Sequence, residues 1–116
     1  MVNRQYDSQP LNVASILTAA GVPNDQGRIR WPLAVKALPP GPQTLELRRQ
    51  LEAHLQVLAT ELLAGRSDPR LVRAANEIVD TLQARLVDRG YLLASGTYDD
   101  GVQFLKKLHK ALALFP

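Results

Sequence analysis

Apolar side chains recur at helical intervals along most of this 116-residue chain. One set lies between residues 42 and 64, where successive members are four, four, three and four positions apart. A second set lies between residues 72 and 86, with steps of three, four, three and four. Such steps keep the apolar side chains on one face of a helix, so the spacing predicts two long amphipathic helices of a bundle. The two sets are Leu47, Leu51, Leu55, Leu58 and Leu62, and Val72, Ala75, Val79, Leu82 and Leu86.

Proline, glycine and capping residues predict where the helices begin and end. Gly65 is expected to end the first long helix, and Asp68-Pro69 to begin the second, because Asp accepts from free amides and Pro lacks an amide to leave unpaired. A short first helix is expected from Pro10 to about residue 20, where Gly21 follows. Pro32 opens a brief helix over 32–38, in which Trp31 is expected to fill the core.

The last helix is predicted to follow a capping box at residues 97–100, Thr97-Tyr98-Asp99-Asp100, with Asp in place of the usual Glu or Gln. Its inward residues are expected to be Tyr98, Val102, Leu105, Leu108 or His109, Leu112 and Phe115. Tyr91, Leu92 and Leu93 lie in the preceding linker and are expected to tuck onto the helix ends.

No stretch longer than about four residues alternates convincingly between apolar and polar positions, and β-branched residues are scarce, so no strand is predicted. The fold class is all-α, an antiparallel bundle of four main helices with a short extra Trp-Pro helix. Residues 1–116 are one domain, with 1–9 expected to be disordered or extended and with linkers at 21–30 and 91–96. The predicted core is Trp31, Leu47, Leu51, Leu55, Leu58, Leu62, Val72, Val79, Leu82, Leu86, Val102, Leu105, Leu108 and Leu112.

Composition narrows the function classes. The chain has no cysteine, which excludes a disulfide framework, a thiolate metal cluster and a cysteine nucleophile. Its apolar runs are too short for a membrane span, and residues 1–10 show no signal peptide. The redox compartment is not predicted, because a core of this size needs no disulfides to be stable, and an exported parent protein is compatible with the sequence. The net charge of +3 is spread thinly, without a block of like charges that would mark a basic arm.

Candidate catalytic chemistry is sparse. His54 is followed at i+3 and i+4 by Val57 and Leu58, and His109 by two apolar residues, so neither has a helical partner suited to metal binding or catalysis. Asp99 and Asp100 are expected to complement a helix dipole. We predict no catalytic, metal-binding or cofactor-binding residue and no cofactor, and we expect that the protein is not an enzyme.

Surface cations supply the candidate interaction surface. Arginines around the two long helices form one group and lysines on the last helix form another. We expect Arg66, Arg70 and Arg73 not to form an unpaired surface, because residues 46–96 hold as many acids as arginines. Some apolar residues lie beside the apolar helix faces that form the predicted core and are expected to be left for a partner. They are Leu71, Ile78, Phe104 and Phe115. The candidate cations are Arg48, Arg49, Arg66, Arg70, Arg73, Lys106, Lys107 and Lys110.

The segment 27–34, a helix pair joined at Gly65, and the segment 98–108 together resemble an uncharacterised helical domain of planctomycete-type bacterial proteins. That domain has a G-x-x-x-W-P-L element, two amphipathic helices and a Y-x-x-A-x-x-F-L-x-x-L helix, whose Ala corresponds to Gly101 here. The resemblance covers roughly residues 12–115. It implies an all-helical bacterial protein, with no activity or ligand attached, whose relatives tend to look exported.

These patterns favour a non-catalytic helical module for protein–protein interaction or scaffolding. The partner would be another protein or a second copy of the chain. The alternative is a weak polyanion- or nucleic-acid-binding domain that uses the surface arginines. Nucleic acid is the less favoured partner because aromatic residues for base stacking are few.

Overall fold

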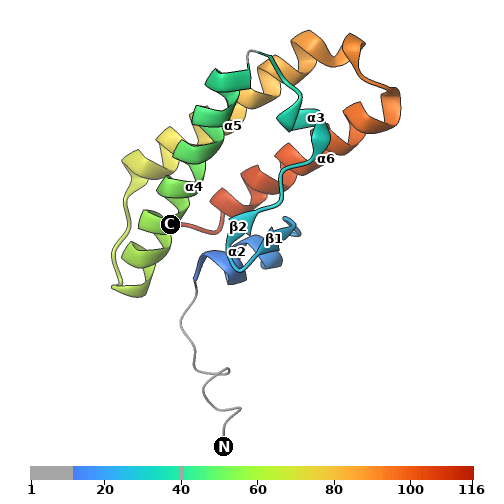
Figure 1. Ribbon diagram of the computed structural model, residues 1–116. Coiled ribbons are helices and arrows are strands. Elements are labelled where there is room, and N and C mark those ends of the chain that lie inside the picture. Colours follow the sequence, from blue (N-terminus) through green and yellow to red (C-terminus); the bar gives the residue numbers. More distant parts are fainter. Residues whose placement is uncertain (1–11, 40) are drawn as a thin grey trace, which may run out of the picture.

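The computed structural model describes residues 12–39 and 41–116 and consists mainly of helices (Figure 1). The predicted first helical position, Pro10, and the predicted extended segment 1–9 lie outside the described residues. The elements in chain order are α2 (Val13–Ala19), β1 (Asn24–Asp25), β2 (Arg28–Ile29), α3 (Leu33–Lys36), α4 (Gly41–Leu63), α5 (Pro69–Arg89), the 3₁₀ turn η1 (Gly90–Leu92) and α6 (Ser95–Leu112).

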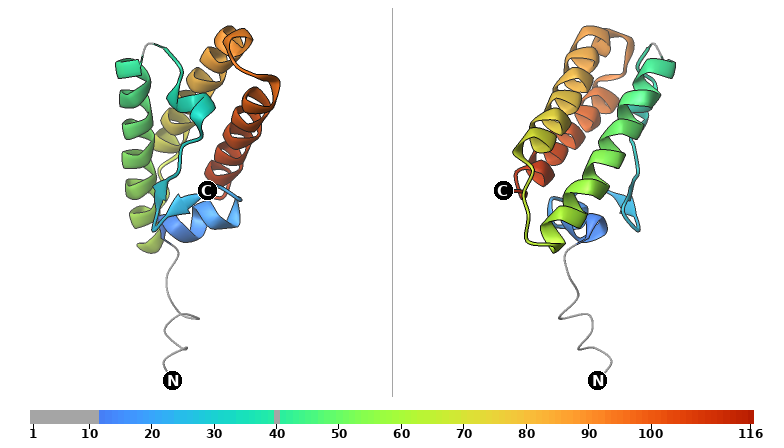
Figure 2. Two further views of the ribbon diagram at one scale, coloured as in Figure 1. Left: turned by 45° about the vertical axis from the view of Figure 1, so that its right-hand side comes forward. Right: turned by 90° about the vertical axis from the view of Figure 1, so that its left-hand side faces the viewer.

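The three long helices α4, α5 and α6 run down, up and down in the view of Figure 1, with α5 packed against both of the others. Residues 12–39 cross the side that α4 and α6 leave open, as Figure 2 shows. Here α2 contacts α4 and α6, and α3 contacts all three long helices. The all-α bundle predicted from the periodicity is confirmed.

The turn between α4 and α5 is built from the predicted residues. Gly65 has a φ of +75°, a left-handed conformation that glycine adopts without strain. Its amide donates to the Leu62 carbonyl at 3.0 Å, and the Arg66 amide donates to the Glu61 carbonyl at 2.8 Å. These two bonds form a Schellman motif. Asp68 then caps α5 by accepting from the Leu71 amide at 3.2 Å.

The segment predicted as a linker, 21–30, contains a small antiparallel hairpin. Asn24 pairs with Ile29, and Asp25 with Arg28. Gln26 and Gly27 both have positive φ, of 54° and 94°, as a tight two-residue hairpin turn requires. Each strand has only two residues, too few for an alternating pattern, which is why the expectation of no strand was wrong.

The core is made of the stripes predicted from the sequence together with side chains from residues 13–38. Leu51, Leu55, Leu82, Leu86, Leu105, Leu108 and Leu112 are almost fully buried, and so are Leu17, Val35 and Leu38 from the crossing segment. Five predicted core residues are only half-buried and pack against this core. They are Trp31, Leu47, Leu62, Val72 and Val102.

The expectation that Leu71, Ile78, Phe104 and Phe115 are left for a partner was wrong, whereas the inward placement of Phe115 was correct. Ile78, Phe104 and Phe115 are buried, because the crossing segment and the neighbouring helices cover a wider arc than one stripe. Leu71 is half-buried against the core.

The turn before α6 also differs from the prediction. Helix α6 begins at Ser95 after Ala94, without a side-chain cap, so Thr97 does not start a capping box. Tyr91 and Leu92 do not tuck onto the helix ends but are exposed. The 3₁₀ turn that continues α5 turns both side chains outward.

Candidate interaction surfaces

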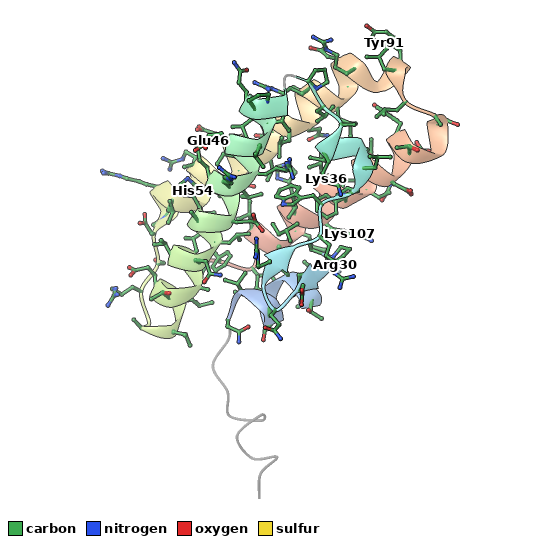
Figure 3. The ribbon with its side chains drawn as sticks, in the orientation of Figure 1. Arg30, Lys36, Glu46, His54, Tyr91 and Lys107 are labelled. Atoms are coloured by element: carbon green, nitrogen blue, oxygen red, sulfur yellow. The ribbon has the colours of Figure 1, made fainter. Side chains whose placement is uncertain are left out.

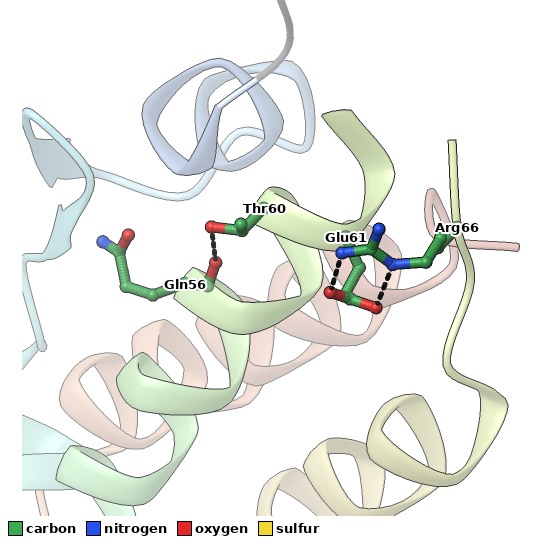
Figure 4. Close-up of polar contacts among 4 residues, drawn as sticks. All are labelled: Gln56, Thr60, Glu61 and Arg66. Atoms are coloured by element: carbon green, nitrogen blue, oxygen red, sulfur yellow. Dashed lines mark hydrogen bonds and ion pairs between the residues drawn. The ribbon is translucent and has the colours of Figure 1, made fainter. Parts of the chain in front are cut away.

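Arg66 is tied to the helix that precedes it. Its Nε donates to one Glu61 carboxylate oxygen at 2.9 Å, and its Nη2 donates to the other at 2.8 Å (Figure 4). The hydrogen bond from Arg66 lowers the pKa of the Glu61 carboxyl below its ordinary value, and the same contact raises the pKa of the guanidinium. The neighbouring Thr60 hydroxyl donates to the Gln56 carbonyl, so its hydrogen bond too is made within α4. Arg66 is therefore a poor candidate for binding an external anion.

Three acids of residues 46–96 accept hydrogen bonds from backbone amides or from glutamine in the described part of the chain. Glu52 accepts from the Ile29 amide at 2.9 Å and so holds the hairpin against α4. Glu46 accepts from Gln50, and Asp68 caps α5. Arg49, Arg70 and Arg73 are exposed. Arg48 is half-buried, with its guanidinium carbon 5.8 Å from the centroid of the Trp31 ring.

The predicted arginines do not form one cluster. Arg85 lies beside Thr44, with 3.5 Å between its Nη1 and the hydroxyl oxygen, which fixes how α4 and α5 are aligned. In this antiparallel alignment Arg48 lies beside about residue 81 of α5. Arg70 lies about three turns further along that helix, roughly 16 Å at 1.5 Å per residue. The lysines Lys106, Lys107 and Lys110 form a separate group that is exposed on α6.

His109 links α6 to α5 through both ring nitrogens. Nδ1 lies 3.0 Å from the Asn76 side-chain oxygen, and Nε2 lies 3.0 Å from an Asp80 carboxylate oxygen. The Asn76 amide nitrogen donates to the Val72 carbonyl, which leaves its oxygen toward the ring. Because both facing atoms are acceptors, the ring makes both hydrogen bonds only when it carries both protons. The contact is a helix–helix link.

His54 lies in an open hollow between α4 and α5, together with Glu77 and Thr81. The spacing within each helix did not predict this grouping because its members come from two helices. The Thr81 hydroxyl donates to the Glu77 carbonyl at 2.9 Å, so it is engaged in the helix. The other lining residues are Leu47, Gln50, Ala74 and Ile78. This set offers an acid and a base but no free nucleophile.

The end of α5 and the turn to α6 expose three apolar side chains. Tyr91 is 79% exposed, Leu92 61% and Val87 59%, and Figure 3 shows Tyr91 at the outer end of the molecule. Val87 and Tyr91 border an open hollow of about 370 Å³ that is also lined by Leu93 and Tyr98. We call Val87, Tyr91, Leu92, Leu93 and Tyr98 the corner surface.

The corner surface rests on a firm base. The Tyr98 ring lies directly against Gly90, where any side chain would collide with it. Leu93 is half-buried and packs against the core, and its amide donates to the Gly90 carbonyl at 3.0 Å. The exposed side chains of the corner surface are therefore carried by a turn that is held by packing and by a backbone hydrogen bond. The sequence showed the apolar residues here but not their orientation.

In residues 12–39 and 41–116, no group of three or more His, Asp and Glu side chains is placed to hold a metal ion. None of the described helices is both long and apolar enough to cross a membrane. Comparisons of the chain with protein-family models, with curated proteins and with solved structures found no match. The resemblance to a planctomycete-type domain stays a prediction.

Proposed function

We propose that this protein is a non-catalytic helical module that binds another protein through the corner surface. The observation that carries the proposal is that exposed Val87 and Tyr91 border one open hollow, with exposed Leu92 next to Tyr91 in the chain. Clustered apolar side chains on a protein surface mark contact sites, whereas isolated ones are ordinary. Tyrosine is also enriched at interfaces, where its ring is buried and its hydroxyl keeps a polar partner.

The hollow suits a side chain of a partner protein better than a small molecule. A ligand pocket surrounds most of its ligand and supplies a few converging polar groups. Here the hollow is open to solvent, and its polar lining is limited to Ser95, two tyrosine hydroxyls and backbone. A partner that inserts an apolar side chain would cover Tyr91 and Val87 together.

Affinity capture from an extract of the source organism tests this proposal. The wild-type protein is compared with Tyr91→Ser and Leu92→Ser, and with Val57→Ser, which changes a 48% exposed apolar residue on α4. A specific partner should be retained by wild type and Val57→Ser and lost from both corner variants. A partner retained equally by all four proteins would contradict the use of this surface.

A second candidate function is weak binding of a polyanion by the surface arginines. One observation favours it: among the eight predicted cations, Arg66 is the one with an ion pair recorded in the described residues. The separation of Arg48 from Arg70 along the bundle weighs against a single strong site. If duplex DNA binds, its affinity should fall with salt at a logarithmic slope of about 0.9 per phosphate contacted. Arg70→Gln and Arg73→Gln should then reduce that slope.

A further inference from the structure

A second surface lies on the side of the molecule where residues 21–37 cross α6. The Arg30 amide donates to the Pro23 carbonyl at 2.9 Å, which places Arg30 beside the turn that contains Gly21. The stem of Lys107 lies over the same turn, with its Cδ 3.7 Å from where a Cβ on Gly21 would stand. Arg30 and Lys107, from distant parts of the sequence, are therefore neighbours.

Lys36 joins these two cations through the packing of α3 on α6. Ala34 lies so close to Gly101 that a Cβ at residue 101 would be 2.8 Å from the Ala34 Cβ. One turn further along α6, Phe104 contacts Trp31, with 5.5 Å between the ring centroids. Lys36 is exposed in the last turn of α3, and Figure 3 shows Lys36, Lys107 and Arg30 in a row.

Leu33 is an exposed apolar residue on α3, three positions before Lys36 and therefore on the same side of that short helix. It is 66% exposed and comes between Arg30 and Lys36 in the chain. We call Arg30, Leu33, Lys36 and Lys107 the α3 face.

The charge on the α3 face is unbalanced. No ion pair of Arg30, Lys36 or Lys107 is recorded within residues 12–39 and 41–116. Arg28 does not belong to the α3 face, because it lies opposite Asp25 in the hairpin. Asp100 shares the side of α6 that carries Phe104 and Lys107, since it precedes them by four and seven positions. Three cations thus face one bordering carboxylate.

We infer that the α3 face binds an acidic segment of a partner protein, one in which carboxylates flank an apolar side chain. The carboxylates complement Arg30, Lys36 and Lys107, and the apolar side chain covers Leu33. This inference rests on the proposed function, because it names the chemistry of a protein partner. It adds a surface separate from the corner surface.

A nucleic acid fits this face less well. Its phosphates would match the three cations but leave Leu33 without an apolar contact. The nearby aromatic residue, Trp31, packs between Arg48 and Phe104 and is half-buried, so it is a poor platform for base stacking.

Fluorescence anisotropy with two labelled peptides of equal charge tests the inference. One peptide repeats Glu-Glu-Leu, and the other contains the same number of Glu residues with Ser in place of Leu. The wild-type protein should bind the Leu-containing peptide more tightly. Arg30→Glu and Lys107→Glu should each weaken its binding at least about fivefold, since each replaces attraction by repulsion. Asp100→Asn should strengthen it.

Two variants separate this site from general charge effects. Lys110→Glu and Arg70→Glu make the same change of charge elsewhere on the surface, and both should retain at least half of the wild-type affinity. Leu33→Ser should weaken the Leu-containing peptide but not the Ser-containing one. Circular dichroism of every variant should match wild type, which would show that each has folded.

Several results would overturn the inference. These are absence of peptide binding, equal losses in Lys110→Glu and Arg30→Glu, and no effect of Leu33→Ser. Tighter binding of duplex DNA or of phosphatidylserine vesicles, lost in the same variants, would assign the face to nucleic acid or to a membrane surface instead. Tyr91→Ser should bind the peptide as wild type does, so a failure here is distinct from failure of the corner surface.

Discussion

At the scale of single residues, Gly101 shows how packing can reverse a preference expected from the sequence. The planctomycete-type pattern has Ala at this position, and alanine favours a helix by up to about 1 kcal/mol over glycine. In the structure, however, a Cβ on residue 101 would stand 2.8 Å from the Cβ of Ala34 and 3.0 Å from a methyl carbon of Leu86. Residue 101 is buried where α3, α5 and α6 meet.

We predict that Gly101→Ala destabilises the protein by about 1 to 3 kcal/mol, because overpacking outweighs the gain in helix propensity. Urea denaturation monitored by circular dichroism measures the change. Gly96→Ala is the matched control, since residue 96 is in the same helix and has no atom within 4 Å of its added Cβ. It should be neutral or stabilising. Equal effects of the two substitutions would show that Gly101 is not needed for close packing.

The pair Glu61–Arg66 predicts a pH dependence with a definite sign. The pKa of Glu61 is lowered in the folded state, chiefly by the hydrogen bond from Arg66. The stabilisation is therefore present above the ordinary carboxyl pKa of 4.5 and is lost as the pH falls through the lower, folded value. An NMR titration of the Glu61 carboxyl should show a pKa below 4.5 that rises toward 4.5 in Arg66→Gln. No change in the variant would mean that the pair does not form in solution.

At the scale of elements, the helices that end at strong local signals were the ones predicted well. Gly65 and Asp68-Pro69 set their boundaries through backbone and side-chain hydrogen bonds made within a few residues. The start of α6 was misplaced because Ala94 offers no side-chain cap and packing of the turn sets the boundary. The hairpin at Asn24–Ile29 was missed because each strand has only two residues, too few for an alternating pattern, and because it is held against α4 by Glu52, a residue distant in sequence.

Asp68→Ala should lower the free energy of unfolding by about 1 kcal/mol, since the Leu71 amide loses its acceptor at the start of α5. Thermal and urea denaturation would both report the loss. Ser67→Ala, one residue earlier at an exposed position, should change stability by no more than about 0.5 kcal/mol. A loss of similar size in both variants would argue against capping by Asp68.

The candidate surfaces were predicted less well than the helices. The sequence indicated which residues are charged or apolar, but the contacts that decide exposure join distant segments. Ile78 and Phe104 were expected to face a partner and are buried, whereas Tyr91 and Leu92 were expected to be covered and are exposed. Trp31 of the crossing segment packs on Phe104, and Ile78 lies where α5 packs against α4, which explains the first error. The 3₁₀ turn after α5 causes the second.

At the scale of the whole molecule, the apolar side chains buried in the core contrast with those exposed on the corner surface. Leu55 is almost fully buried in the core, so Leu55→Asp should cost at least about 2 to 5 kcal/mol, through lost burial and a buried charge. Tyr91→Ser should change the free energy of unfolding by less than about 0.5 kcal/mol, because the side chain is 79% exposed. Chemical denaturation of both variants tests this contrast. A large loss in Tyr91→Ser would show that the residue serves stability.

Site-specific photocrosslinking in the source organism tests the central claim most directly. A photoreactive phenylalanine replaces Tyr91 in one protein and Val57 in another, so that the probe stands either on the corner surface or on exposed α4. We predict one discrete crosslinked protein from position 91, lost when Leu92→Ser is added, and none at comparable yield from position 57. Absence of a crosslink from position 91, or the same products from both positions, would contradict a protein-binding corner surface.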